Sequence, residues 1–554
     1  MNVKKNNQVK TGYALLVALL ICCVSCIKDT GNYIYHDVNS VEIGGINNVY
    51  IRELSAPLKI NPVLNFSVGE DASVFEYQWH RIGAVNESTT TGSFTSRGIV
   101  SREKNLDIII GAPWFTVSGR YDMLFCVFNR TTGVRYSHRF SLDIQDKMLI
   151  GYVMLCETKE NFDLDLISLK DDTLTQYHNV LDLMNSKIPR EGATPWDVVS
   201  YSDHASPTLA QDGLKNHALW ILTDKSSERV RVENFEWKPE FNISGISMVL
   251  DKFLPEGEKL TARKMNAQRH TESDCQNWIY DKQGNWYWFN WAVLTNFCIH
   301  PINRTRGSEE PYKAAPFIFG NPGACAVLFN EDANRFEVQS SNPMGSTAAM
   351  MYTSPLTGQA IFDWQNPNYR LMYMDNKSRT EGFAVVRNVQ TSRYEYLEWV
   401  VSGDGKTSPD KNNRKDFPLD DSVPFDDFEH FALHTQTPYL FCATENKLYR
   451  IDVNMMPLTG WVDVTHQVLP EGHLFSKVIS SVKFPRSNMI VVCTYDLFGE
   501  KGQNGRLALY NVEHGTGNLT LAKHPSEPTA NGYQIDMEWD GFGKIIGVDY
   551  RNVR

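Results

Sequence analysis

Two histidines have a spacing that could support metal binding. His430 and His434, in the segment HFALH, stand four residues apart, as two zinc ligands on one helix face do. A metalloprotease places glutamate directly after its first histidine, and here that residue is Phe431. The neighbouring residues favour strands, in which residues four apart share a face. We therefore interpret the two histidines as strand residues and predict no metal site.

Carboxylates could instead support acid–base catalysis. They form three clusters: Asp420-Asp421, Asp426-Asp427-Glu429 and Glu272/Asp274. A glycosidase needs two carboxylates about 5–10 Å apart across a cleft, and closeness in sequence does not supply that arrangement. In an acidic chain such residues are more typical of solvated loops. The sequence predicts no catalytic residue and no cofactor, and it favours a non-enzymatic protein. A structural calcium ion in a turn such as Asp332-Ala333-Asn334 stays open.

Aromatic residues are the candidates for ligand contact, because their faces stack on sugar rings and on peptide side chains. The segment 278–291 holds seven of them. Alternate residues of a strand face opposite sides, so packing between neighbouring sheets is the favoured alternative there. For Trp364 and Trp196, prolines and asparagines nearby indicate loops, and both readings stay open. The predicted ligand-binding residues are Trp196, Trp286, Trp288, Trp364 and Tyr369.

Short strands separated by turns dominate the chain from Ser40 onward, which indicates an all-β protein. Residues 41–146 are predicted to form an Ig-like β-sandwich. Within it, Tyr77 and Trp79 point to one sheet face. Two alternating strands meet across Thr131-Thr132-Gly133, a hairpin signal in which glycine supplies a positive φ.

Residues 147–554 repeat a unit of apolar strand, polar turn and apolar strand every 40–60 residues or so, which is typical of propeller blades. GYVMLCETKENFDLDLISL is one such pair, and the segment MEWDGFGKIIGVDY is predicted to hold the last. The number of pairs predicts a β-propeller of about six to eight blades. Closure into a ring leaves few free sheet edges.

The N-terminus predicts export and lipidation. Three lysines precede an apolar run over residues 13–21 that is too short to span a bilayer comfortably. The run leads to Ser25 and then Cys26, which is similar to a bacterial lipobox. We predict a signal peptide over residues 1–25, lipidation of Cys26 and a tether over residues 26–40. An ordinary signal peptide without lipid is the alternative.

Charge and composition exclude two broad classes. The 554 residues carry 54 Lys+Arg against 65 Asp+Glu, a net charge of −11, so nucleic acid is not an expected partner. Apolar residues make up 42%, which excludes disorder as a description of the whole chain. Cleavage before Cys26 would remove three lysines and no acid, so the mature charge would be −14.

Cysteine usage does not suggest a disulfide framework. Beyond Cys26 the chain has an odd number of cysteines, without close pairing, and most stand in apolar strand-like runs. Buried free thiols are the favoured interpretation. The seven are Cys126, Cys156, Cys275, Cys298, Cys325, Cys442 and Cys493.

Several motifs follow one another along the chain. They are Cys26 with the acidic residue Asp29 behind it, Gly31-Asn32-Tyr33, the Tyr77/Trp79 strand, Gly119-Arg120-Tyr121 with its Thr-Gly hairpin, and Gly151-Tyr152-Val153-Met154-Leu155. In this order they resemble the PKD-like family lipoproteins of Bacteroidota. The charged tether behind Cys26 likewise resembles the surface-export signal of such lipoproteins. The resemblance implies a PKD-like sandwich at the N-terminus.

The resemblance also implies a location and a role. We expect an outer-membrane protein that faces the cell exterior and contacts the membrane through its lipid anchor only. The expected partners are a SusC/SusD-like TonB-dependent importer complex and a glycan or peptide nutrient. The resemblance transfers no catalytic motif. Two alternatives stay open: a surface glycan-active propeller hydrolase or lyase, and a purely structural importer subunit.

Overall fold

A computed structural model describes the chain between residues 39 and 552. Gaps of one to four residues interrupt it, and the longer gaps are 83–97, 203–216, 268–275, 291–299, 340–352, 356–361, 402–412, 481–488 and 525–534. The predicted signal peptide, most of the tether and Cys26 lie outside the described residues. So do Glu272 and Asp274. In the part that is described, no helix is both long and apolar enough to cross a membrane.

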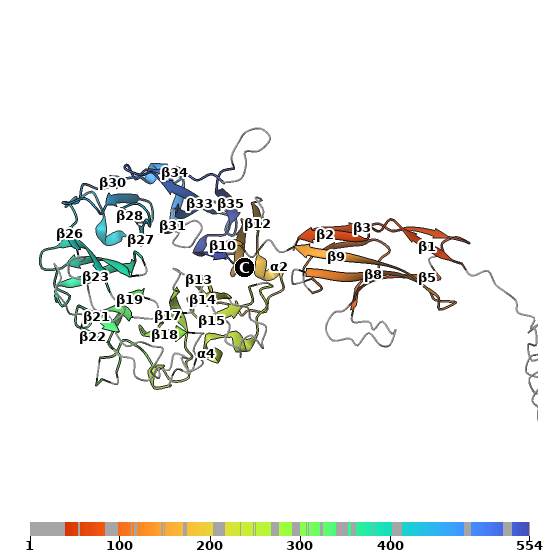
Figure 1. Ribbon diagram of the computed structural model, residues 1–554, viewed down its shortest axis with the longest axis horizontal. Coiled ribbons are helices and arrows are strands. Elements are labelled where there is room, and N and C mark those ends of the chain that lie inside the picture. Colours follow the sequence, from red (N-terminus) through yellow and green to blue (C-terminus); the bar gives the residue numbers. More distant parts are fainter. Residues whose placement is uncertain are drawn as a thin grey trace, which may run out of the picture.

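Two β-structures make up the fold: an elongated sandwich and a ring of blades (Figure 1). The sandwich has a five-stranded sheet in the order β2-β9-β8-β5-β6 and two strand pairs, β1-β4 and β3-β7. These strands are β1 (Val41–Gly44), β2 (Val49–Glu53), β3 (Pro57–Ile60), β4 (Val63–Phe66), β5 (Phe75–Ile82), β6 (Ile99–Ser101), β7 (Leu106–Ile109), β8 (Gly119–Asn129) and β9 (Arg135–Gln145).

The core of the sandwich confirms the predicted role of the Tyr77/Trp79 strand. Trp79 is fully buried, lies 4.3 Å from Phe125 between ring centroids, and donates to the Glu103 carbonyl at 2.9 Å. Tyr77 stacks on the same Phe125 ring, so both face one side. The predicted hairpin is also present, because β8 and β9 pair across the turn and Gly133 has a φ of +72°.

Seven sheets form the ring within the described residues, which confirms the propeller and places its blade number inside the predicted range. From the axis outward they are β36-β10-β11-β12, β13-β14-β15, β16-β17-β18, β19-β20-β21-β22, β23-β24-β25-β26, β27-β28-β29-β30 and β31-β32-β33-β34. We number them blades 1 to 7.

The strands of blades 1 to 4 are β10 (Ile150–Glu157), β11 (Phe162–Ser168), β12 (Thr175–Tyr177), β13 (Pro195–Ser202), β14 (His217–Thr223), β15 (Ser227–Val230), β16 (Ala262–Ala267), β17 (Gln276–Asp281), β18 (Trp286–Asn290), β19 (Ala314–Asn321), β20 (Cys325–Asn330), β21 (Arg335–Gln339) and β22 (Ser354–Pro355). Short helices α2 (Val180–Leu183) and α4 (Ile243–Ile246) follow blade 1 and blade 2.

The strands of blades 5 to 7 are β23 (Tyr369–Asn376), β24 (Glu381–Asn388), β25 (Arg393–Val400), β26 (Asn413–Asp416), β27 (His430–Leu433), β28 (Tyr439–Ala443), β29 (Leu448–Asp452), β30 (Val462–Asp463), β31 (His473–Ser480), β32 (Met489–Asp496), β33 (Gly505–Val512), β34 (Leu519–Leu521) and β35 (Glu538–Phe542). One more strand, β36 (Ile545–Asn552), completes blade 1.

The last two strands correct a detail of the sequence interpretation. β35 and β36 were expected to form one strand pair, but β35 pairs with β33 in blade 7 and β36 pairs with β10 in blade 1. The chain crosses from the last blade to the first between them. The C-terminal strand thus supplies the innermost strand of the first blade and closes the ring (Figure 1).

The described residues form seven hydrophobic clusters, and each contains residues of adjacent blades. The aromatic segment of blade 3 shows how. Trp278, Trp286 and Trp288 pack toward blade 4, whereas Ile279 and Tyr287 pack toward blade 2. Alternate residues therefore fill the gaps on both sides of the blade, as the strand period predicts.

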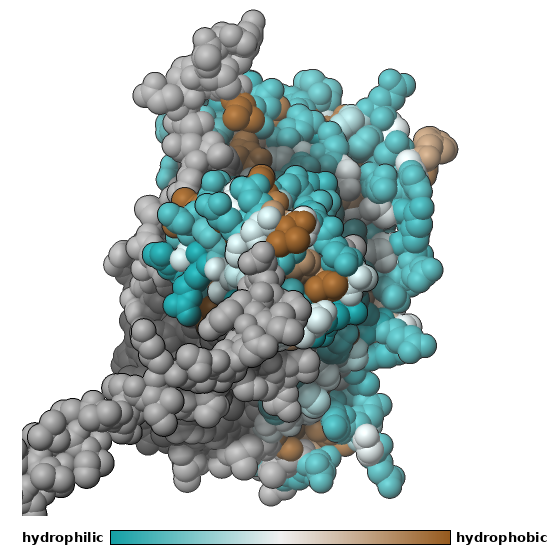
Figure 2. All heavy atoms as spheres, turned by 90° about the vertical axis from the view of Figure 1, so that its right-hand side faces the viewer, coloured by the Kyte–Doolittle hydropathy of each residue, from teal (hydrophilic) through white to brown (hydrophobic). Residues whose placement is uncertain are grey.

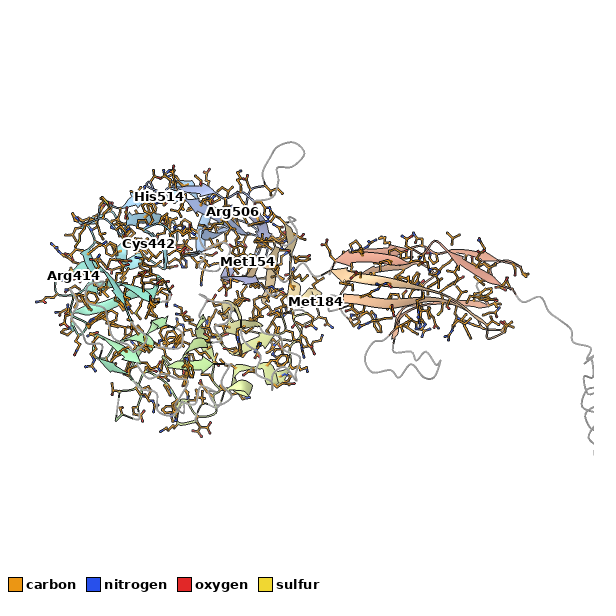
Figure 3. All side chains as sticks on the ribbon, viewed as in Figure 1. Met154, Met184, Arg414, Cys442, Arg506 and His514 are labelled. Carbon is orange, nitrogen blue, oxygen red and sulfur yellow. The ribbon has the colours of Figure 1, made fainter. Side chains whose placement is uncertain are left out.

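The sandwich and the ring are joined by a shared core. Phe115 and Met148, at the end of the sandwich, belong to the same cluster as Leu181 and Met184 of blade 1. Figure 3 shows Met184 at the side of the ring next to the sandwich. Arg551 of β36 is fully buried and donates through Nε to the Met148 carbonyl at 2.7 Å. This bond connects the ring closure to the linker.

The surface around the outer end of the sandwich is mainly hydrophilic, with apolar residues scattered on it (Figure 2). The described cysteines are free and buried, as predicted: Cys126, Cys156, Cys325, Cys442 and Cys493. Cys275 and Cys298 lie outside the described residues.

Candidate functional site

A cavity of about 350 Å³ lies on the propeller axis. The innermost strand of every blade contributes to its wall, in the order Val548, Asp197, Lys264, Phe317, Asp375, His430 and Lys477 from blade 1 to blade 7. Five of these seven side chains are polar or charged. Its size is in the range of small-molecule sites.

Bulges help to aim the wall residues. The pairing of the innermost strand with the next strand slips at Trp196, Arg263, Met372 and Ser476. In each case the residue that follows the slip borders the cavity: Asp197, Lys264, Tyr373 and Lys477. A bulge shifts the alternation of a strand and can re-aim a side chain. A bulge in the innermost strand of four blades thus directs side chains toward the same cavity.

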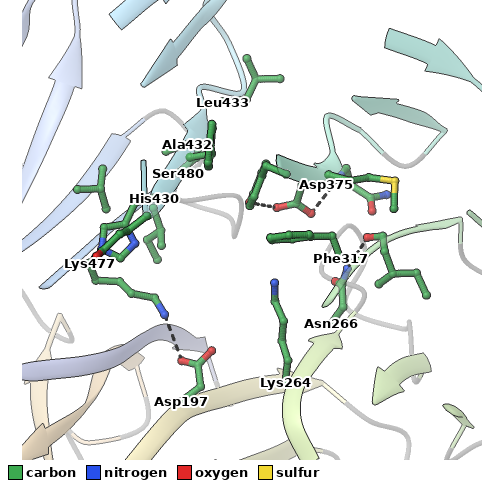
Figure 4. A pocket seen from close by; sticks show the side chains of 18 of the residues that line it. Asp197, Lys264, Asn266, Phe317, Asp375, His430, Ala432, Leu433, Lys477 and Ser480 are labelled. Atoms are coloured by element: carbon green, nitrogen blue, oxygen red, sulfur yellow. Dashed lines mark hydrogen bonds and ion pairs between the residues drawn. The ribbon is translucent and has the colours of Figure 1, made fainter. Parts of the chain in front are cut away.

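Lys264 points into the cavity from β16, beside Phe317 (Figure 4). Its ammonium donates to the Pro316 carbonyl at 3.1 Å and lies 4.5 Å from the centre of the Phe317 ring. Burial lowers the pKa of Lys264, and the charge of Lys477 lowers it further, whereas Asp375 and Asp197 oppose the shift. The amine is thus held in a weakly solvated position.

Asp197, Lys477 and His430 form the opposite wall (Figure 4). Lys477 Nζ lies 3.9 Å from Asp197 Oδ1, which also accepts from the Val198 N–H at 3.0 Å. Gly547 leaves room for Asp197, because a Cβ there would stand 2.5 Å from the same oxygen. Burial, with a smaller effect of Lys477, lowers the pKa of His430 to about 4, so this ring is neutral near pH 7.

Asp375 and two aromatic rings form the third part of the wall. Asp375 accepts from the Tyr373 hydroxyl at 2.9 Å through Oδ2 and from the Asn376 N–H at 2.8 Å through Oδ1. The Tyr373 ring stacks on Phe431 at 5.0 Å and meets Phe317 edge-on at 5.1 Å. Burial raises the pKa of the Tyr373 hydroxyl, and the nearby Asp375 charge raises it further.

Of the five aromatic residues that the sequence analysis selected, Trp286 borders the cavity and the other four do not. Trp364 is in a turn, as expected, but only 3% exposed, and it packs 5.6 Å from Trp399 between ring centroids. Tyr369 is buried and donates to Glu395 Oε2 at 2.7 Å. Trp286 and Trp288 are buried as well; Trp286 borders the cavity and donates to the Ala315 carbonyl.

Trp196 was expected in a loop and lies instead in β13, at the bulge, half-buried against the cluster between blades 2 and 3. Trp288, Trp364 and Tyr369 are buried, so a ligand could stack on these three rings only if the blade packing were rearranged. Ligand contact at the five predicted aromatic residues stays an untested prediction, and the packing alternative describes where the rings are.

The two histidines lie on and next to strand β27, not on a helix. His430 borders the cavity, and His434 bonds through Nδ1 to Thr437. The turn at Asp332 connects β20 and β21. Among the described residues, no group of three potential metal ligands comes together.

Lys264, Lys477, Asp197 and Asp375 were missed by sequence reasoning. Lys264 and Lys477 stand as lone lysines in the strands ARKMNA and HLFSKVIS. A charged residue beside apolar residues, as Lys477 stands before Val478 and Ile479, is a signal that could have identified Lys477. Lys264 follows Arg263 and has no such signal.

Comparisons with known proteins give a match at the N-terminus. The model of a family described as PKD-like matches residues 26–187, which include the sandwich and the first strands of blade 1. No curated protein matches the chain.

Among solved structures, a quinonprotein alcohol dehydrogenase-like protein from Bacteroides thetaiotaomicron is similar at 9% identity, over 94% of this chain and 100% of that chain, with a TM-score of 0.41. A DUF4784 family protein from Bacteroides caccae shares 9% identity over 92% and 98% of the two chains, with a TM-score of 0.25. AztD from Citrobacter koseri shares 9% identity over 72% and 100%, with a TM-score of 0.32.

Proposed function

We propose that this chain is a lipid-anchored surface protein that captures a nutrient in the axial cavity of its propeller, without catalysis, as an accessory to a SusC/SusD-like importer. The cavity carries this proposal: all seven blades contribute to it, and four of them carry bulges that precede its polar and aromatic residues. Polar side chains held in a weakly solvated cavity cost free energy unless they are paired, and a bound ligand can provide that pairing.

Binding is favoured over hydrolysis by the way the two wall aspartates are used. Asp375 accepts hydrogen bonds from its own strand through both oxygens, and Asp197 is engaged by Val198 and Lys477. Groups held in this way serve as structural acceptors rather than as a proton donor and a nucleophile.

The sandwich supports the surface location that the tether motif predicts. Its longest strands, β8 and β9, have 11 residues each and would span roughly 35 Å. The first strand, β1, lies at the end farthest from the ring (Figure 1). A chain anchored at Cys26 would therefore hold the cavity away from the membrane, where an importer could reach it.

Two experiments test the proposal. Binding of the full chain, purified in detergent, to a panel of glycans and peptides should be saturable, and Lys477→Gln should weaken it while the exposed Lys447→Gln leaves it unchanged. Failure of every panel member to bind would contradict direct capture and favour the structural-subunit alternative. Cys26→Ala should move the protein from the membrane fraction to the soluble fraction, and retention in the membrane would contradict the anchor.

A further inference from the structure

The cavity wall uses its carboxylates internally. Asp375 accepts from the Tyr373 hydroxyl and the Asn376 N–H, one on each oxygen. Asp197 accepts from the Val198 N–H and faces Lys477. A third carboxylate, Glu429, stands at the edge of the cavity and is exposed to water. The acidic groups inside the cavity are therefore largely satisfied by the protein itself.

Some hydrogen-bond donors of the cavity wall lack an acceptor among the residues that the structure describes. Lys264 has three N–H donors and bonds to one acceptor, the Pro316 carbonyl. Among the described residues no carboxylate lies within ion-pair distance of it, and Lys477 reaches Asp197 only at 3.9 Å. The buried Ser480 hydroxyl has no hydrogen-bond partner in the described part of the chain. A ligand that accepts hydrogen bonds would satisfy these donors.

The rest of the cavity selects for size and for an apolar body. Phe317, Met372, Tyr373 and Phe431 line it beside the lysines. A volume of about 350 Å³ accommodates one or two sugar rings or a dipeptide. A longer chain could place only its end inside.

We infer that the cavity recognises a small organic anion, with a carboxylate held by Lys264 and Lys477 and the body of the ligand against Phe317 and Tyr373. The inference rests on the proposed function and names its ligand class. Burial lowers the pKa of the Lys264 ammonium, and a bound carboxylate would oppose that shift by stabilising the charged form. A uronic acid residue and the C-terminus of a peptide are the two sources of such a group.

Matched ligand pairs test the inference on the full chain. One arm compares glucuronate and galacturonate disaccharides with the neutral glucose and galactose disaccharides. The other compares dipeptides that have a free carboxylate with the same dipeptides as amides. We expect one arm to show at least tenfold tighter binding of the carboxylate member by calorimetry, with affinity that falls as salt rises. The arm that responds identifies the source of the carboxylate.

Variants assign the preference to Lys264. Lys264→Met keeps the apolar stem and should reduce carboxylate binding at least tenfold. Lys313→Met, at an exposed lysine paired with Glu331 outside the cavity, should leave it unchanged. Equal binding of the neutral partners would overturn the inference and leave nutrient capture standing, whereas absence of all binding would overturn both. Should Lys264→Met fail to fold, the comparison of matched ligands on the unaltered chain decides alone.

Discussion

At the scale of single residues, several ionisable groups are buried for structural reasons. Asp281, at the end of β17, is fully buried and accepts from the N–H groups of Gln283 at 3.0 Å and Asn285 at 2.7 Å. Burial raises the pKa of this carboxyl to about 6, against the hydrogen bonds, which lower it. The folded chain therefore holds this proton at a pH where the unfolded chain has already released it.

This shift predicts a pH dependence with a definite sign. Between about pH 4 and pH 6 only the folded chain binds the proton, so the contribution of Asp281 to the free energy of unfolding falls as pH rises. Asp281→Asn removes the titration. Two pKa units correspond to at most about 3 kcal/mol, so the variant should gain up to that amount over the native chain between pH 4 and pH 7.

Denaturant unfolding at both pH values measures the difference. Asp421→Asn, at an exposed aspartate, is the control and should show no such change. A difference between the Asp281 variant and the native chain that is the same at pH 4 and pH 7 would mean that this carboxyl does not titrate in the window.

At the scale of elements, the blades share a turn device. The second strand of each blade ends at or next to a side chain whose oxygen accepts a backbone N–H of the following turn: Thr158, Thr223, Asp281, Asn330, Asn388, Thr444 and Asp496. Such side chains satisfy N–H groups that the turn leaves without a strand partner. Seven blades thus begin their second hairpin in the same way, with three residue types.

Loss of one such oxygen should weaken its blade. Asn388 accepts from the N–H groups of Gln390 at 3.1 Å and Thr391 at 3.2 Å. Asn388→Ala removes both bonds in a partly buried turn, so we expect a loss of about 1–2 kcal/mol in the free energy of unfolding. Thr391→Ala, an exposed change in the same turn, is the control. Equal stability of the two variants in denaturant titrations would contradict a structural role for the Asn388 oxygen.

The turns also show what the sequence could predict. Strand pairs and their turns could be predicted, because the alternation of apolar and polar residues and the Gly or Asn residues of turns are local features of the sequence. Blades 4 and 5 even share letters, with Asn330 and Glu337 spaced as Asn388 and Glu395 are, each with an arginine two residues before the glutamate. The other blades have Thr or Asp at this position. The blades therefore repeat an oxygen acceptor and not the same residue.

The cavity residues could not be predicted from local sequence in the same way. Lys264 and Lys477 lie 213 positions apart and meet only because the ring closes around one axis. The bulges before them interrupt the alternation on which strand prediction depends. Trp364 was selected because aromatic residues often contact ligands. Its burial depends on packing between blades, which the local sequence does not reveal.

At the scale of the whole molecule, one strand connects the two ends of the ring and the linker to the sandwich. Within β36, Asp549 Oδ2 accepts from the Ser200 N–H of blade 2 at 2.7 Å, and Arg551 donates to the Met148 carbonyl. Tyr550 packs against Tyr152 of blade 1. The eight residues of β36 therefore close the ring, contact blade 2 and hold the linker to the sandwich.

Removal of β36 should therefore open the ring rather than trim it. Truncation after Phe542 would expose the paired edge of β10 and remove Val548 from the cavity wall. We expect a chain that aggregates and loses its cooperative thermal transition, because an open β-edge is a template for association. A truncation that removes only residues 553–554, beyond β36, is the control and should melt like the native chain.

Complementation separates loss of closure from general damage. A synthetic peptide of residues 543–554, added during refolding of the truncated chain, should occupy the vacant edge of β10 with the native antiparallel register and restore the near-ultraviolet circular dichroism signal. A peptide with Arg551→Met should restore less of it, because the Met148 carbonyl would lose its charged donor. A truncated chain that melts as sharply as the native protein without any peptide would show that the ring does not depend on its last strand.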